Sequence, residues 1–222
     1  MTTRDDKVAR FRALHRPGRP LLMPNPWDLG SARMLAALGA QALATTSSGH
    51  AFTLGRPDMG HVGRDEALAH AAAVAVAVAV PVNGDTENCY ARDPDLAAET
   101  VGLAAGAGLA GCSIEDTDLP GSDAYPFDLA LARVQTAVAA AREANIVLTA
   151  RADGVLTRAY DAAEAVRRSA AFAEAGADVI YAPLVELETL AELCRIGVPV
   201  NALATGRFAR HTVDEYARLG VA

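Results

Sequence analysis

The sequence predicts an α/β fold, a (β/α)8 barrel formed by one domain, and three observations predict it. Short apolar runs alternate seven times with longer Ala- and Leu-rich stretches of helical spacing. The apolar runs are continuous, which is typical of parallel strands covered by helices. Polar side chains follow almost every run, as they do where a barrel forms its site at the carboxyl ends of its strands. A doubly wound open sheet is disfavoured, because the chain has no GxGxxG turn.

The expected strands and helices alternate in order along the chain. We expect strands over residues 20–24, 42–46, 80–84, 111–115, 146–151, 178–182 and 199–203. We expect helices between them over residues 29–38, 64–77, 94–105, 127–144, 161–174 and 185–195. Several helices end at a glycine that suits a left-handed cap, such as Gly39 and Gly176, and the next strand follows within a few residues. Pro94 stands where the first turn of its helix is expected.

The expected barrel is one unit short. The last residues, Leu219-Gly220-Val221-Ala222, look like the cap of a helix and the first residues of an eighth strand. We therefore expect a single domain over residues 1–222, truncated at the start of the eighth strand, with an exposed sheet edge in its place. Either the sequence is clipped or something outside the chain closes the barrel, and both explanations stay open.

The composition limits the partners of the protein. The chain is 51% hydrophobic and carries a net charge of −7 with no local cluster of basic residues, which disfavours nucleic acid and anionic membranes as partners. The longest apolar stretch, residues 71–82, is shorter than the about 20 residues that a membrane span needs. The polar N-terminus lacks the apolar core of a signal peptide, and the three cysteines form no CxxC pair. We expect a cytoplasmic protein.

Two pairs of acidic residues are candidate metal ligands. Asp85 and Glu87 follow the third apolar run, and Glu115 and Asp116 follow the fourth. Carboxylates at the ends of adjacent parallel strands converge, and such oxygen ligands suit Mg²⁺ or Mn²⁺. The alternative is that these acids cap the following helices or form salt bridges, and the spacing alone leaves it open.

A candidate for binding an anion is Arg151, at the end of the fifth run. Its guanidinium could hold a substrate carboxylate through two parallel hydrogen bonds. The alternative is a structural ion pair with Glu115 or Asp116, and both interpretations can hold together. A turn rich in Ser, Thr and Gly at residues 45–49 could add an anion-binding nest of backbone amides.

Four motifs in this order resemble the isocitrate lyase and phosphoenolpyruvate mutase superfamily. They are PNPWDLGSARMLAALGAQALATTSSGHAFTLGRPD, VPVNGDTENCY, GCSIEDT and TARADG. The resemblance covers nearly the whole chain and implies an Mg²⁺-dependent site, with Mn²⁺ as the substitute, for 2-keto or 2-hydroxy carboxylates. It implies that Asp85 binds the metal directly, while Asp58, Glu87 and Glu115 hold the metal's water molecules.

The resemblance also implies a set of substrate-binding residues. Thr46, Ser47 and Ser48 would cradle a substrate carboxylate, and Arg151 would face the reacting group. Trp27 and Asp28 would line the mouth of the barrel, with Asn201 deeper in the pocket. Members of the superfamily usually assemble into homo-oligomers, so we expect a dimer or a tetramer.

The sequence departs from the family in the loop that follows the fourth strand. Isocitrate and methylisocitrate lyases carry a Lys-Lys/Arg-Cys-Gly-His segment there, whereas residues 117–128 contain no Cys, Lys or His. Both activities are therefore disfavoured, and so is mutase chemistry, because the lid Lys and Asn of mutases are missing. We expect these residues to act as a lid, and Asp116, Ser122, Asp123 and Tyr125 are the candidate proton donors or orienting groups. No histidine is assigned a role.

The function predicted from these observations is that of an enzyme, an Mg²⁺-dependent carbon-carbon bond lyase. It would act on a small 2-keto or 2-hydroxy carboxylate or dicarboxylate through an enolate, with Arg151, Glu115 and Asp116 as catalytic residues. Decarboxylation of a β-keto acid such as oxaloacetate is the simplest version, since it needs no thiol. The alternatives are phosphonopyruvate hydrolysis or phosphoenolpyruvate mutase chemistry, and a non-catalytic protein that binds a keto acid with Mg²⁺.

Overall fold

The structure, a computed structural model, describes residues 2–222 and contains a curled parallel sheet of six strands in the order β1-β2-β3-β4-β5-β6. The strands are β1 (Leu43–Ala44), β2 (Val82–Gly84), β3 (Gly111–Glu115), β4 (Val147–Arg151), β5 (Val179–Tyr181) and β6 (Val200–Asn201). This half-barrel confirms the α/β fold and the parallel sheet. Each of the six lies within a range that the sequence predicts.

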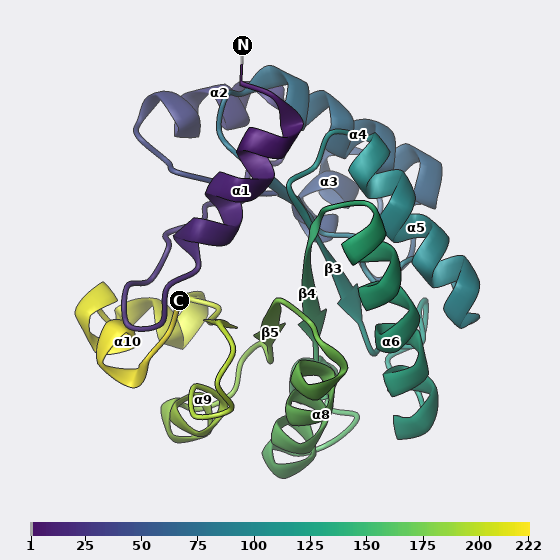
Figure 1. Cartoon of the computed structure of the whole chain (residues 1–222), viewed down its shortest axis with the longest axis vertical. Helices are drawn as coiled ribbons and strands as arrows, with labels where there is room; N and C mark the ends of the chain where they lie inside the picture. The colour runs from purple at the N-terminus through teal and green to yellow at the C-terminus, as the bar shows by residue number, and fades with distance from the viewer. Residues whose placement is uncertain (1) are drawn as a thin grey trace.

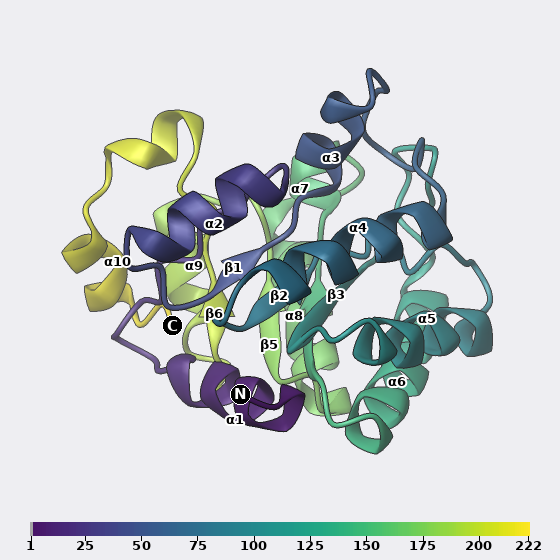
Figure 2. The ribbon, with the colours of Figure 1, turned by 90° about the horizontal axis from the view of Figure 1, so that it is seen from above.

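Helices surround the sheet on its outer face, as Figures 1 and 2 show. They are α1 (Arg4–Leu14), α2 (Leu29–Ala37), α3 (Ser47–Thr53), α4 (Arg64–Ala77), α5 (Pro94–Gly106), α6 (Phe127–Glu143), α7 (Gly154–Thr157), α8 (Ala162–Ala175), α9 (Leu187–Leu193) and α10 (Val213–Leu219), with a 3-10 helix, η1 (Gly206–Arg210). The many alanines on their inner faces allow the helices to lie close to the strands. No helix within residues 2–222 combines the length and the apolar character that crossing a bilayer requires.

The first predicted strand, residues 20–24, does not form a ladder. Pro20 and Pro24 have no N–H to donate, so the segment lies beside β1 with a single hydrogen bond, from Ala44 N to Pro24 O at 3.2 Å. On the other side of the sheet, Ala222 N donates to Val200 O of β6 at 3.1 Å, and Gly18 N donates to Val221 O at 3.0 Å. These isolated bonds link β6 back towards β1.

The expectation of an exposed edge beside β6 is not confirmed. Val221 and Ala222 are both 4% exposed, and Ala222 occupies the hydrogen-bonding position next to Val200. The start of the expected eighth strand is therefore packed into the domain and covers part of the edge.

Helix α1 closes the end of the barrel where the strands begin. Its Val8 and Phe11 are buried in a cluster with Ala110 and Val147, residues at the amino ends of the strands. Phe11 lies so close to Gly111 that a Cβ on Gly111 would be 2.5 Å from Phe11 Cε1. Any larger residue at this position would displace the helix.

Helices α3 and α4 are joined by two stacked histidines. The rings of His50 and His70 lie 3.8 Å apart at an interplanar angle of 11°. The pKa of His70 is lowered to about 4, mainly by burial and in part by the neighbouring His50, while Asp28 opposes the shift. The stack is therefore made by neutral rings at neutral pH.

The contact at Gly111 leads to a prediction about stability. Gly111→Ala should destabilise the fold by about 2 kcal/mol, because the added methyl overpacks the junction of α1 and the sheet. The matched control is Gly102→Ala on the exposed face of α5, where nothing lies within 4 Å, and it should stabilise by about 0.5–1 kcal/mol. Urea unfolding of both variants measures the difference. Equal midpoints would contradict the close packing at Gly111.

The histidine stack leads to a prediction about acid stability. The folded-state pKa of His70, about 4, lies below the ordinary value of 6.5, so the unfolded chain binds more protons between these pH values. Stability should therefore fall as the pH drops from 6.5 towards 4. His70→Phe keeps a stacked ring without a titrating group, and it should remove about 1 kcal/mol of this loss, below the full linkage value because the ring is half-buried. Melting temperatures across this pH range test the prediction, and parallel curves for the two proteins would refute it.

Candidate active site

The candidate site is centred on the buried guanidinium of Arg151, at the carboxyl end of β4. It forms ion pairs with Asp153 at 2.7 Å, Glu115 at 2.9 Å and Asp85 at 3.3 Å, and none of these side chains is more than 14% exposed. Glu115 lies directly opposite Arg151 in the register of β3 and β4. The structure thus brings the carboxylates predicted at two strand ends together around the guanidinium of Arg151.

The hydrogen bonds of Arg151 show how its orientation is fixed. Its Nε donates to Asp153 Oδ1 at 3.1 Å and its Nη2 donates to Asp153 Oδ2 at 2.7 Å, a bidentate pair. The remaining nitrogen, Nη1, points to Asp85 and Glu115. Of the alternatives raised by the sequence, the ion pair of Arg151 with Glu115 is present, and neither Asp85 nor Glu115 caps a helix.

The site carries more negative than positive charge. One guanidinium faces Asp85, Glu87, Glu115 and Asp153, and burial raises the pKa of Glu115 well above its usual range although Arg151 opposes the shift. Burial likewise raises the pKa of Glu87 to about 7, against the hydrogen bond from Gly60. Burial alone would lower the pKa of Arg151, but the attraction of Asp153, Glu115 and Asp85 outweighs it. The charge excess favours a bound cation.

The predicted metal ligands fit a divalent cation that keeps water in its shell. Glu87 Oε1 accepts a hydrogen bond from Gly60 N at 2.9 Å, while Glu87 Oε2 is buried without a partner in the protein. Asp58 lies near enough for its charge to raise the pKa of Glu87. In the part of the chain that the structure describes, no three His, Cys, Asp or Glu side chains form a close cage. An all-oxygen set with room for water suits Mg²⁺.

The residues predicted to bind a substrate carboxylate lie beside Asp85. Ser47 N donates to Asp85 Oδ2 at 2.9 Å, and the hydroxyls of Thr46 and Ser48 are hydrogen bonded to each other at 2.9 Å. Thr46 is also the N-cap of α3, since its Oγ1 accepts from Gly49 N. The turn between β1 and α3 therefore places hydroxyls and backbone amides next to the carboxylates.

Three further predicted residues occupy different positions. Trp27 is 49% exposed and packs edge-on against Phe52, 6.1 Å away, at the rim. Asp28 is the N-cap of α2, because its Oδ1 accepts from Ser31 N at 2.7 Å. Asn201 lies at the end of β6, opposite Tyr181 in the register. Asp28 is thus used locally by its own helix.

Asp116 has no free oxygen. Its Oδ1 accepts from Asp153 N at 2.8 Å, and its Oδ2 accepts from the Tyr160 hydroxyl at 2.7 Å and from Arg168 Nη1 at 3.0 Å. These contacts hold the turn that carries Asp153, the partner of Arg151. The catalytic role predicted for Asp116 stays untested, and its geometry is that of a residue that positions Arg151.

Two buried arginines on the outer helices were missed by the sequence analysis. Arg133 of α6 is 1% exposed and donates to Glu115 O at 3.0 Å and to Asn88 O, carbonyls at the edge of the site. Arg168 of α8 donates to Asp116 and to Tyr125 O. A charged residue on an otherwise apolar helical face could have revealed them. Arg133, for example, shares the buried face of α6 with Ala130 and Ala137.

The segment predicted as a lid is anchored at both ends. Tyr125 N donates to Asp116 O at 2.8 Å, and Thr117 forms an antiparallel bridge with Ala124. The Tyr125 ring lies 4.1 Å from the guanidinium of Arg133, and its hydroxyl accepts from Asn88 Nδ2 at 3.0 Å. The segment is shorter than the predicted 117–128, because α6 begins at Phe127.

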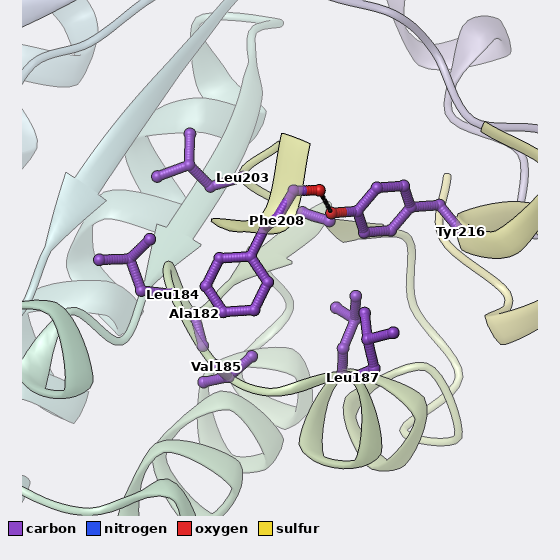
Figure 3. Close-up of a pocket in the computed structure, with 9 residues that line it drawn as sticks. Ala182, Leu184, Val185, Leu187, Leu203, Phe208 and Tyr216 are labelled. Atoms are coloured by element: carbon purple, nitrogen blue, oxygen red, sulfur yellow. Dashed lines mark hydrogen bonds between the residues drawn. The ribbon is translucent and has the colours of Figure 1, made fainter. Parts of the chain in front are cut away.

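A cavity beyond β5 and β6, outside the candidate site, is apolar and therefore unsuited to a carboxylate. It measures about 230 Å³, and side chains such as Leu184, Leu203 and Phe208 line it (Figure 3). The hydroxyl of Tyr216 donates to Phe208 O at 2.9 Å, as the dashed line marks. Its one polar side chain is thus already hydrogen bonded.

The site has no amine nucleophile. Lys7 is the only lysine of the sequence, and its Nζ donates to Ala75 O and Val78 O at the carboxyl end of α4. Lys7 belongs to α1, which covers the opposite end of the barrel. The reactive groups at the mouth are therefore carboxylates, hydroxyls, amides, one guanidinium and the imidazoles of His50 and His70.

Comparisons with known proteins identify the family of the chain. The family model for phosphoenolpyruvate phosphomutase matches residues 11–222. A solved structure from Burkholderia cenocepacia J2315 is 41% identical, with a TM-score of 0.92, and the match covers 98% of this chain and 80% of that one.

Two relatives with named activities are also similar. The 2,3-dimethylmalate lyase of Eubacterium barkeri is 28% identical, over 78% of this chain and 62% of that enzyme. A structure of oxaloacetate acetylhydrolase in complex with the product oxalate is 26% identical, with a TM-score of 0.87, over 98% of this chain and 78% of that one. The chain therefore belongs to the phosphoenolpyruvate phosphomutase family and is an enzyme of the isocitrate lyase and phosphoenolpyruvate mutase superfamily.

Proposed function

We propose that this enzyme is a divalent-metal-dependent lyase that cleaves a carbon-carbon bond in a small 2-keto or 2-hydroxy dicarboxylate. The observation that carries the proposal is the bidentate, buried Arg151 set among Asp85, Glu115 and Asp153. The names of two relatives support a four-carbon diacid framework, since one is a lyase of a dimethylmalate and the other acts on oxaloacetate. Oxaloacetate is the simplest substrate.

Asp85 is proposed as the residue that binds the cation directly, with Asp58, Glu87 and Glu115 holding its water. Mg²⁺ is the expected ion and Mn²⁺ the substitute, because the donors are all oxygens. When bound, the cation supplies Lewis-acid stabilisation of negative charge on substrate oxygens.

The residues of the chain itself bind and orient the substrate. Ser47 and Ser48, with Thr46, would hold one carboxylate, and Arg151 would stabilise the negative charge that develops on the enolate. Glu115, whose pKa burial raises, is the proposed proton carrier beside Arg151. The segment from residue 117 to 125 would exclude water from these groups.

Phosphonopyruvate hydrolysis or phosphoenolpyruvate mutase chemistry is the second candidate. The match to the phosphoenolpyruvate phosphomutase model favours it. The composition of residues 117–128, which include no lysine, weighs against it. The non-catalytic alternative gains no support, since the named relatives are lyases and hydrolases.

We also propose where the enzyme acts and how it assembles. We expect it to act in the cytoplasm as a homo-oligomer without nucleic acid or membrane partners. Exposed apolar side chains on and beside α2, such as Met34 at 60% and Leu38 at 78%, are consistent with subunit contacts. The half-barrel is proposed to be part of an eight-unit plan, in which Val221 and Ala222 begin the eighth strand.

The proposed function leads to a prediction about Asp85. With Mg²⁺, the wild-type enzyme should turn over at least one member of a panel of 2-keto and 2-hydroxy dicarboxylates, and EDTA should abolish turnover. Asp85→Asn should lower kcat/KM by at least about 10²-fold, because the cation loses its direct ligand. Asp65→Asn makes the same charge change on a side chain that is 92% exposed, and it should have no effect. The proposal fails if no substrate is turned over and Asp85→Asn binds cations as the wild type does.

A further prediction concerns the planar guanidinium of Arg151. Arg151→Lys keeps the charge but cannot make the bidentate pair with Asp153, so kcat should fall by about 10²-fold. The control is Arg207→Lys, in an exposed ion pair with Glu186, which should leave kcat unchanged. Steady-state kinetics, on whichever substrate of the panel the wild type turns over, measure kcat for both variants. A fully active Arg151→Lys enzyme would show that charge alone suffices.

A further inference from the structure

One cavity beside the site gathers buried polar atoms that have no hydrogen-bond partner in the protein. Nine such side-chain atoms occur in residues 2–222, and four of them are His50 Nδ1, His50 Nε2, His70 Nε2 and Glu87 Oε2. All three residues line a cavity of about 280 Å³, part of which opens to solvent, together with Asp85 and Ser47. Buried polar atoms without partners are costly, so this cavity is built to hold a polar ligand.

The geometry of the two histidines fixes what they can offer. Their rings are parallel and 3.8 Å apart, an arrangement that two imidazolium cations would disrupt by repulsion. A neutral imidazole has one N–H donor and one nitrogen lone pair that accepts a hydrogen bond. The stack therefore presents acceptors to the cavity without adding positive charge.

The charges around the cavity exclude one class of ligand from part of it. Asp85 and Glu87 line it together with the neutral rings, so a carboxylate would be repelled from the part of the cavity beside these two side chains. A cation is attracted, and the water molecules of a hydrated cation can donate hydrogen bonds to Glu87 Oε2 and to the acceptor nitrogen of each neutral ring. Part of the cavity opens to solvent, so water molecules can enter it.

We propose that His50, His70 and Glu87 accept hydrogen bonds from the water molecules of the divalent cation that Asp85 binds. The inference rests on the proposed function, because it assumes a cation at Asp85. It adds two residues from α3 and α4 that lie 20 positions apart and have no ligand spacing in the sequence. The two histidines set the affinity of the site through the cation's water, without touching the ion.

The test measures cation binding without any substrate. Free Mn²⁺ is quantified by its electron paramagnetic resonance signal during titration of the wild type, Asp85→Asn, His50→Phe and His70→Phe. Phe keeps a flat ring in the stack but removes the nitrogens. Each Phe variant should bind Mn²⁺ about 10–100-fold more weakly, the usual effect of removing a group that orients a metal's ligands.

Two further variants guard against indirect effects. His70→Gln keeps a hydrogen-bond acceptor and should regain most of the affinity lost in His70→Phe. His211→Phe, beside η1 and away from the cavity, should bind Mn²⁺ as the wild type does. Circular dichroism melting confirms that each variant is folded, and His50→Phe and His70→Phe report independently on the same cavity.

The outcomes separate this inference from the proposed function. If Asp85→Asn loses Mn²⁺ while both Phe variants bind like the wild type, the role of the histidines is overturned and the proposed function stands. If the wild type binds no Mn²⁺, or Asp85→Asn binds as well as the wild type, the proposed function itself is overturned. Weaker binding in the Phe variants, with recovery in His70→Gln, supports the inference.

Discussion

The positive charge of Arg151 is the constraint on which the rest of the site depends. Glu115, Asp85 and Asp153 can remain buried only because the guanidinium lies within 3.3 Å of each of them. Burial raises the pKa of Glu115 and of Asp153, the latter to about 6, so burial by itself opposes the charged form of both carboxylates and Arg151 favours it. A cation bound beside them would complete the balance.

The outer helices hold this centre in place as much as the strands do. Arg133 and Arg168 reach inward from α6 and α8 and donate hydrogen bonds to carbonyls and to Asp116 at the strand ends. Asp116 in turn holds the backbone of Asp153, which orients Arg151. The position of the central charge therefore depends on side chains two layers away, and the packing of α6 and α8 becomes part of the chemistry.

Features that repeat along the chain could be predicted from the sequence, whereas contacts that depend on packing between elements could not. Continuous apolar runs predicted all six strands of the sheet, because burial on both faces leaves a clear pattern. Residues 20–24 share that pattern but lack the N–H groups of Pro20 and Pro24. The stack of His50 on His70 and the engaged oxygens of Asp116 left no signal, since each arises from residues brought together only by folding.

The docking of α1 has a consequence for how the chain folds as it is made. Arg4 hydrogen bonds to Ala144 O, 140 residues later, and Phe11 packs against Val147 at the start of β4. During synthesis, α1 must wait until more than 130 further residues have followed before its binding surface on the sheet exists. Helix α1 therefore reaches its place only after the strands that it covers have formed, and until then the floor of the barrel stays open to water.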